Sequence, residues 1–486
     1  LGPSIALGKP AASSGGLLRS RAFVNLSEEA SDTALADIAA ARELSRSFMN
    51  DAMFARTMGV SLDILEALAL VQKGESERAR DLIVAAGRRR AYSLPVQELT
   101  TLVLLHTARG SETASPYSAL LPLDPDAVRS QFAWLVSEGH FAEAAAIYPI
   151  IDAEPAPPTA EGPLGAEMAN VIAEAQHLAA RSITGMLGAY SYAATGKVAE
   201  ARALVAQTQV SLAQATAPSP TGGFAAAQNT LAPVKRFADL WGFLILARCD
   251  VADGKAAEVP KLLVGKGLPT AAATVEFFTA LRAGLPANER GRVPAPELFA
   301  KALADKRSDE KLEFAGLEAN LPRIEFSANQ AEYKHSAKSV VDVLGPSGFR
   351  RDGFRSREDV GRGITTVEFL GNFATASSVD EMTLLYAADL ANQKGKVGFV
   401  IVARRDYKRT MSVTRGFSHT PVSSSPAGFK TELDVRFIDT IPSAGTIDNA
   451  RIVDAARVYA ELAPVYIRPG TSSVQATSRA LGLRLP

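Results

Sequence analysis

A helix–turn–helix phrase recurs four times along this chain and limits what the chain can fold into more than any other feature. In each copy a glycine ends an Ala- and Leu-rich helical segment, a small residue follows five positions later, and a larger apolar residue comes four positions after that. The glycines are Gly74, Gly139, Gly196 and Gly254; the small residues are Ala79, Ala144 and Ala201, with Val259 in the last copy; the larger residues are Ile83, Tyr148, Val205 and Leu263. Glycine adopts the left-handed conformation that ends a helix, and a small residue lets the next helix pack closely. The phrase therefore predicts stacked helix pairs.

The phrase resembles the tetratricopeptide repeat. Gly196, Ala201 and the preceding Tyr192 fall where that family has its turn glycine, its close-packing alanine and an aromatic residue of the first helix. Successive glycines are separated by more than one family repeat of about 34 residues, and the Trp and Pro positions of the family are missing from most copies. The resemblance implies a degenerate α-solenoid, and an irregular helical bundle is the alternative.

The pattern changes after Ala319. Residues Phe429 to Phe437 alternate apolar and charged side chains, which predicts a half-buried antiparallel strand. The apolar run Val397 to Ala403 predicts a buried strand, and Ile364 to Leu370 predicts another. Helices are expected to end at Gly345, to begin at Ser378 with Glu381 completing a capping box, and to run from about Asp448 to Leu462. The predicted fold is mostly α with a C-terminal α+β domain, that is, an α-solenoid of helix pairs followed by a small sheet covered by helices.

These patterns divide the chain into four parts. Residues 1–26 are rich in Gly, Ala, Ser and Pro and predict a flexible linker; residues 27–319 predict the helical-repeat domain; residues 320–470 predict the α+β domain; and residues 471–486 predict a tail. Because the chain starts at Leu1 and not at Met, either an export signal has been removed or the sequence is a fragment, and we expect the former.

The order of elements in the α+β part resembles small proteobacterial envelope lipoproteins of unknown function. The matching pieces are Val367–Asn372, a cap at Thr375–Ser378, the helix Leu384–Leu390, and Gly395 followed by Phe399–Val402. The resemblance implies a periplasmic or envelope-associated location, with peripheral attachment, and no activity. The chain has no N-terminal cysteine for lipidation and carries Tyr386 and Asp389 where the family has Arg and Glu, so a cytoplasmic location stays open.

Several function classes are disfavoured by composition and by missing motifs. Lys and Arg equal Asp and Glu at 52 each, which argues against nucleic-acid binding, and no run of eighteen apolar residues predicts a transmembrane segment. The five histidines and the lone Cys249 have no metal-ligand spacing, so no metal site is expected and Cys249 is interpreted as a buried structural thiol. No G-x-S-x-G, P-loop or G-x-G-x-x-G motif is present, so we expect no cofactor and assign no catalytic residue.

Basic clusters are the best candidate sites. Their members are Arg350, Arg351, Arg355 and Arg357, expected in one loop, and Arg404, Arg405, Lys408 and Arg409, expected directly after the buried strand. Together they predict a cationic patch for an anionic glycan, a lipid headgroup or an acidic partner. The alternative is a solvated face, neutralised by acids such as Asp352 and Asp406. The pair Asp380–Glu381 is attributed to the start of a helix, and Arg88–Arg90 to the end of one, because the helix dipole favours both.

We predict a non-enzymatic interaction or scaffold protein of the bacterial envelope, which binds a protein or peptide partner on a face of the helical repeats. The alternative is an enzyme or ligand-binding protein with its site in a cleft between the solenoid and the α+β domain. That site would use Arg404 and Arg405 with Asp406 or Tyr407 on an anionic ligand or glycan.

Overall fold

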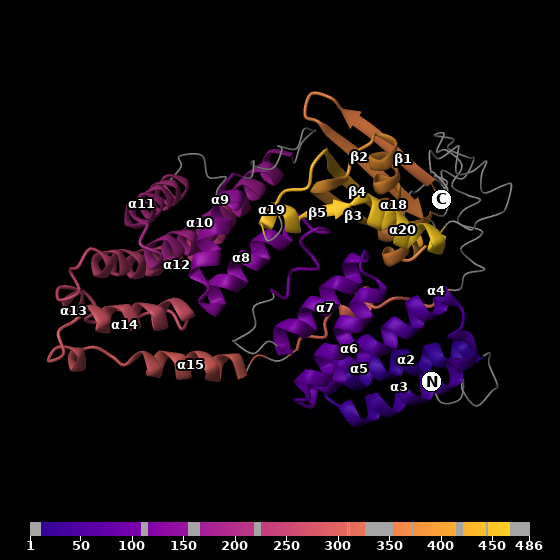
Figure 1. Cartoon of the computed structure of the whole chain (residues 1–486), viewed down its shortest axis with the longest axis horizontal. Coiled ribbons are helices and arrows are strands. Elements are labelled where there is room, and N and C mark those ends of the chain that lie inside the picture. Colours follow the sequence, from indigo (N-terminus) through magenta and orange to yellow (C-terminus); the bar gives the residue numbers. More distant parts are fainter. Residues whose placement is uncertain are drawn as a thin grey trace. The chain divides into compact units, whose positions relative to one another are not determined.

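The computed structural model describes residues 11–107, 115–153, 166–217, 225–308, 310, 312–325, 353–371, 374–414, 421–443 and 446–466. Helices dominate up to Asn320, and a five-stranded antiparallel sheet with covering helices follows (Figure 1). The predicted fold class, mostly α with a C-terminal α+β part, is confirmed. Within the described residues, no helix combines the length and the hydrophobicity that a transmembrane span requires.

The chain forms two compact units, and their boundary differs from the predicted domain boundary. The first unit joins described residues of Leu1–Ala127 with those of Leu312–Pro486, and the second is Val128–Lys311. The N-terminal helices therefore pack with the sheet region instead of continuing one helical domain to residue 319. Local sequence pattern gives no sign of this, because the contacts that join the two segments lie almost 300 positions apart.

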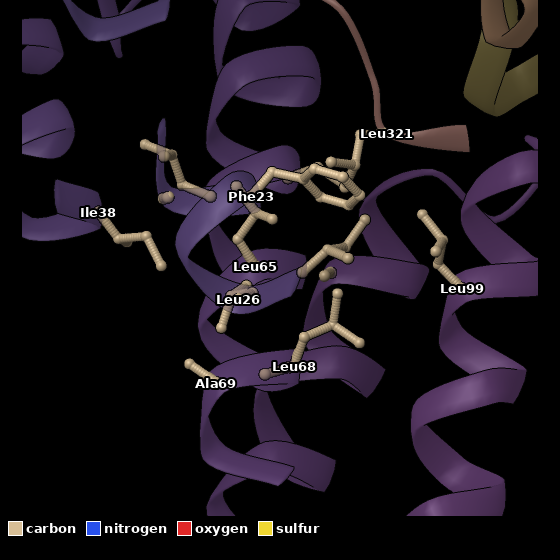
Figure 2. Packing of buried hydrophobic residues seen from close by; sticks show 14 of the residues in the cluster. Phe23, Leu26, Ile38, Leu65, Leu68, Ala69, Leu99 and Leu321 are labelled. Carbon is tan, nitrogen blue, oxygen red and sulfur yellow. The ribbon is translucent and has the colours of Figure 1, made fainter. Parts of the chain in front are cut away.

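The first unit begins with a layer of helices. They are α2 (Ala11–Ser27), α3 (Ser31–Ser45), the 3-10 turn η1 (Arg46–Phe48), α4 (Ala52–Phe54), the π-helical turn η2 (Ala55–Gly59), α5 (Val60–Gln72), α6 (Ser76–Arg89) and α7 (Leu94–Thr107), with α16 (Leu317–Asn320) returning later in the chain. Figure 2 shows their shared core, in which Phe23 and Leu26 of α2 lie near Leu65 and Leu68 of α5.

The linker predicted for residues 1–26 is wrong where the structure describes that segment. Residues 11–26 belong to helix α2, whose Leu18, Ala22 and Leu26 are buried at four-residue intervals. Its glycines serve close packing rather than flexibility, since a Cβ at Gly15 would collide with the side chain of Ser45. Residues 1–10 and the predicted tail, 471–486, lie outside the described residues.

The second unit continues the helix pairs. Its helices are α8 (Ala127–Glu138), α9 (Phe141–Asp152), α10 (Ala166–Ala194), α11 (Val198–Ala215), α12 (Ala225–Ala252), α13 (Val259–Leu262), α14 (Ala272–Gly284), the 3-10 turn η3 (Arg290–Arg292) and α15 (Pro296–Ser308). The helical, repeat-like arrangement confirms the predicted pairing of helices.

The turn glycines behave as the phrase predicts. Gly74, Gly139, Gly196 and Gly254 have φ angles of +75°, +84°, +83° and +79°. The small residues Ala79, Ala144 and Ala201 are fully buried between paired helices. The last copy is cut short, because α13 has four residues and ends before Leu263.

Substituting Gly196 by alanine tests whether the turn requires a residue that adopts the left-handed conformation without strain. A Cβ at Gly196 would meet no atom within 4 Å, so the cost comes from the positive φ alone. We expect the free energy of unfolding to fall by about 1–2 kcal/mol. Gly267→Ala is the matched control, because its Cβ also meets nothing and its φ is not in the left-handed region. Chemical denaturation followed by tryptophan fluorescence measures both, and equal losses in the two variants would refute the assignment.

The sheet lies in the first unit. Its strands are β1 (Gly353–Asp359), β2 (Ile364–Gly371), β3 (Gly398–Thr414), β4 (Pro421–Ile438) and β5 (Ile452–Asp454), in the order β1-β2-β4-β3-β5 with all pairs antiparallel. Helices α18 (Ala376–Gln393) and α20 (Ala455–Tyr466) pack on one face (Figure 1). Leu433 and Val435 of β4 are fully buried on that face, which confirms the alternation predicted for Phe429 to Phe437.

Of two helices predicted in this region, one is wrong as a single element and the other lies outside the described residues. The helix expected from Asp448 to Leu462 is wrong as a single element, because the chain forms the short α19 (Ile447–Ala450), then β5, then α20. The apolar residues Ile452 and Val453 pair with Val400 and Phe399 at the edge of β3 instead of continuing a helix. The helix expected to end at Gly345 lies outside the described residues.

Candidate functional site

The first group of predicted arginines is placed only in part. Arg350 and Arg351 lie outside the described residues. Arg355 and Arg357 lie on β1 and not in a loop, because Gly353–Asp359 pairs along its whole length with β2. Arg355 is 3.5 Å from the Glu368 carboxylate on the neighbouring strand, so its charge is countered within the sheet.

A β-bulge decides where the second group points. Strand β3 continues well past Ala403, and its register with β4 shifts between Ile401 and Ala403. The extra residue reverses the alternation of side chains beyond it. As a result Arg404 lies opposite Leu433 on the helix-covered face, whereas Arg405 lies opposite Glu432 on the other face.

Arg404 is buried and ion-paired. Its side chain is only 7 % exposed, and it contacts Asp380 of α18 at 2.8 Å and Asp406 at 2.6 Å. Asp380, which is fully buried, also accepts a 2.5 Å hydrogen bond from the Leu94 backbone N–H at the start of α7. Arg404 is therefore part of the contact between the N-terminal helices and the sheet region, and it is not a surface cation.

The outer face of the sheet carries a ladder of compensated charges. Arg405 donates to Glu432 at 2.6 Å and to Asp434 at 3.1 Å, and Lys430 contacts Glu368 at 2.9 Å. The Lys430 ammonium also lies 4.9 Å from the centre of the Tyr407 ring. Of the second group, Lys408 is exposed and Arg409 is half-buried. The structure thus places Arg404 and Arg405 on opposite faces, each with its own acids, and does not bring them together as one cationic patch.

A second buried network surrounds Glu381, the neighbour of Asp380 on α18. Arg90 and Glu381 are both 0 % exposed and form a two-pronged ion pair, with both hydrogen bonds 2.9 Å long. Tyr466 of α20 donates its hydroxyl to Glu381 at 2.5 Å, and Arg56 approaches at 3.1 Å. Glu381 thereby links three parts of the first unit that are distant in sequence.

The carboxylate of Glu325 extends this network. It accepts hydrogen bonds from Thr375 at 2.5 Å and Ser378 at 2.7 Å, at the beginning of α18. The backbone N–H of Glu325 donates to the Thr57 hydroxyl at 3.1 Å. The segment containing Glu325 is thereby fixed to both η2 and α18.

The sequence interpretation of these charged residues was wrong. Glu381 does not complete a capping box, because α18 begins earlier and its N-cap is Thr375, which accepts from the Ser378 N–H. Asp380 and Glu381 lie in the second turn and point into the protein interior. Arg90 likewise has a buried partner, so the helix dipole does not account for it. The sequence offered one signal for this shift: Thr375, part of the predicted cap, is itself a residue type that caps helices, and it precedes Ser378 by three positions.

The pKa values of the neighbouring acids Asp380 and Glu381 are shifted in opposite directions. Although burial alone raises the pKa of Glu381, Arg90 and Arg56 hold it below its usual value. Burial raises the pKa of Asp380 to about 6, against the opposing effects of Arg404 and the Leu94 N–H. Glu98 of α7, an exposed residue, has its pKa raised to about 7 by desolvation and by Asp124, Asp380 and Asp406, against the opposing effect of Arg404. Arg404 thus contacts the Asp380 and Asp406 carboxylates and interacts electrostatically with those of Glu98 and Asp124.

The second unit contains an open groove of about 380 Å³. It is lined by Glu138, Gly139, Phe141, Ala272, Val275, Glu276, Ala300, Leu303, Ala304 and Arg307. The last four form one stripe along α15, since residues three and four apart share a helix face. Stacking of Phe299 on Phe278, with ring centres 4.5 Å apart, holds α15 against α14.

The polar groups at the groove are already paired. Arg307 donates to the Ser137 carbonyl at 2.8 Å and to Glu138 at 2.7 Å. Glu276 accepts from Tyr190 at 2.6 Å and forms an ion pair with Arg248 at 2.9 Å. The groove therefore presents mainly aliphatic and aromatic surface.

No protein-family model matches this sequence, and no curated protein or solved structure is significantly similar to it. Among the described residues, no three or more His, Cys, Asp or Glu side chains are grouped so that they could hold a metal ion.

Proposed function

We propose that the protein is a non-enzymatic interaction protein that binds an apolar helical segment of a partner protein on its α-solenoid unit. The observation that carries this proposal is the open groove between α15 and the α8–α9 turn, with the apolar stripe of Ala300, Leu303 and Ala304 along one wall. Its volume of about 380 Å³ lies within the range of about 300–1,000 Å³ that is typical of ligand sites. Grooves between helices commonly receive the apolar face of another helix.

A peptide fits this groove better than a small molecule does. Small-molecule sites fix their ligands with a few convergent polar groups. Here Arg307 and Glu276 are engaged by other residues of the second unit, so little polar capacity is left for orienting a small ligand. Apolar burial, which is not directional, favours a partner that supplies several side chains in a row.

A peptide-display selection on the full chain tests the proposal. Peptides enriched on the wild-type protein are expected to bind Leu303→Glu at least about tenfold more weakly, because the charge would have to lose its water. Leu298→Glu is the matched control, since Leu298 lies on the same helix and is 64 % exposed. Enrichment that is equal on wild type and Leu303→Glu, or absent on both, would contradict the proposal.

The carboxylate cluster around Arg404 supports a second candidate, an enzyme or ligand-binding site. Glu98, with a pKa raised to about 7, could exchange a proton at neutral pH, as a general acid or base must. The site would lie within the first unit, between α7 and β3. A ligand screen by thermal shift distinguishes the two candidates. A compound that stabilises wild type but not Glu98→Gln would favour this second function.

The envelope location is proposed with the first function and rests only on the resemblance of the α+β part to envelope lipoproteins. Fractionation of the native cells with an antibody against the protein tests it. Recovery in the periplasmic or washed-membrane fraction would support the location, and recovery with cytoplasmic markers would overturn it.

A further inference from the structure

We propose that a second cavity, between α9, α10 and α11, binds a small zwitterion: a free α-amino acid with a side chain no larger than that of serine. The cavity measures about 100 Å³ and lies wholly in the second unit. Its wall includes Tyr148 and Asp152 of α9, Arg181, Ser182 and Gly185 of α10, and Thr208 of α11. This site is separate from the peptide groove, and it stands or falls independently of the proposed function.

Gly185 keeps the cavity open. A Cβ at that position would lie 3.1 Å from the Thr208 hydroxyl oxygen and 3.7 Å from the Tyr148 hydroxyl oxygen, and both groups line the cavity. One turn away, the Tyr148 ring packs directly on Gly188, where a Cβ would come within 2.5 Å of it. The two glycines thus let the ring lie flat on α10 while its hydroxyl reaches the cavity.

Ser182 provides a buried polar group without a partner. The residue is 2 % exposed, and its hydroxyl has no hydrogen-bond partner within the part of the chain that the structure describes. Helical Ser and Thr hydroxyls usually bond the carbonyl four residues back, as Thr208 does to Leu204 at 2.8 Å. Ser182 lines the cavity instead, so its hydroxyl is available to a ligand there.

The mouth of the cavity carries one charge of each sign. Asp152 and Arg181 are 3.2 Å apart, with side chains that are 43 % and 52 % exposed. The Tyr148 hydroxyl is 3.4 Å from the Asp152 carboxylate, which is long for a hydrogen bond to a charged acceptor. The Asp152 carboxylate therefore has capacity for a stronger donor.

These groups complement both ends of an amino acid. Its ammonium would donate to Asp152, and its carboxylate would accept from Arg181 and from the Ser182 hydroxyl. The small volume, with Gly185 as the floor, excludes long side chains. A neutral polyol would satisfy the hydroxyls but would have no charged group to bind the Asp152 carboxylate or the Arg181 guanidinium, which is why the zwitterion is favoured.

Isothermal titration calorimetry of the full chain with glycine, L-alanine, L-serine and L-leucine tests the assignment, with glycerol as a neutral comparison. We expect binding of at least one of the three small amino acids but not of leucine or glycerol. Asp152→Asn and Ser182→Ala are expected to weaken binding by at least about tenfold and about threefold, respectively. Gly185→Ala is expected to abolish it.

The controls separate a lost site from lost folding. Arg181→Gln changes only an exposed side chain at the mouth, so it should keep the wild-type thermal transition while still weakening binding. Ser137→Ala, away from this cavity, should bind as wild type does. The proposal is overturned if no small amino acid binds at about 10 mM, which would mean a cavity filled by water only. It is also overturned if binding survives in Asp152→Asn and Gly185→Ala, or if glycerol binds as tightly.

Discussion

Replacing Arg90 by methionine is expected to lower the free energy of unfolding of the first unit by about 3–5 kcal/mol. The substitution leaves Glu381 fully buried without the two 2.9 Å hydrogen bonds that now balance its charge. The remaining contacts, to Tyr466 and the partly exposed Arg56, do not replace that pair. Since the pair joins α6 to α18, its loss should separate segments that are distant in sequence.

The two tryptophans allow a sharp measurement of this effect. Trp134 and Trp241 both lie in the second unit, so their fluorescence reports that unit, whereas circular dichroism reports both. Arg90→Met should shift a circular-dichroism transition in urea and leave the fluorescence transition in place. Tyr466→Phe, which removes one hydrogen bond, should cost about 1–3 kcal/mol. The double variant Arg90→Met, Glu381→Met should lose less than the single variant, because no unpaired charge remains. A loss below about 1 kcal/mol for Arg90→Met would show that the pair does not hold the unit together.

Replacing Arg404 by methionine is expected to cost about 3–5 kcal/mol at pH 8 and clearly less at pH 5. Without Arg404, Asp380 must either stay charged in the interior or take up a proton. Its pKa is already raised to about 6 with Arg404 present and should rise further without it. A carboxyl whose pKa is raised by folding contributes stability at low pH, and that contribution is lost as the pH rises from its unfolded pKa through its folded pKa. The variant should therefore weaken steadily above pH 4, through and beyond pH 6.

Arg405→Met is the matched control for this prediction. Arg405 is the next residue on the same strand but faces outward, is 39 % exposed, and pairs with Glu432 and Asp434. Exposed pairs contribute about 0–1 kcal/mol, so its replacement should cost little at either pH. Urea denaturation of both variants at pH 5 and pH 8 measures the difference. If both variants lose the same free energy of unfolding, or if the loss in Arg404→Met does not depend on pH, the buried role of Arg404 is contradicted. That result would favour the surface patch predicted from the sequence.

The parts of the fold that follow local rules could be predicted from the sequence. Gly196 and Ala201 locate a turn and a helix seam because each acts within a few residues of itself. The alternation from Phe429 to Phe437 locates a half-buried strand for the same reason. These signals were enough for the helix pairs and the class of the C-terminal part.

What could not be predicted depends on contacts distant in sequence or on shifts by one residue. Arg90 and Glu381 are each unremarkable in their local context, and only the fold brings them together. A single bulge at Val402 decides whether Arg404 or Arg405 faces inward, and no local pattern marks it. The Gly- and Ser-rich start of α2 was interpreted as a linker because its close packing against Ser45 is a tertiary contact.

Site-specific photo-crosslinking in the native cells tests the proposed function most directly. A photoreactive phenylalanine analogue would replace Leu303 in the groove or, in a parallel strain, Leu298 on the exposed side of the same helix. The proposed function predicts a discrete crosslinked partner from position 303 and none from position 298, with peptide sequencing locating the crosslink in an apolar helical segment of the partner. No crosslink from position 303, or the same products from both positions, would contradict it.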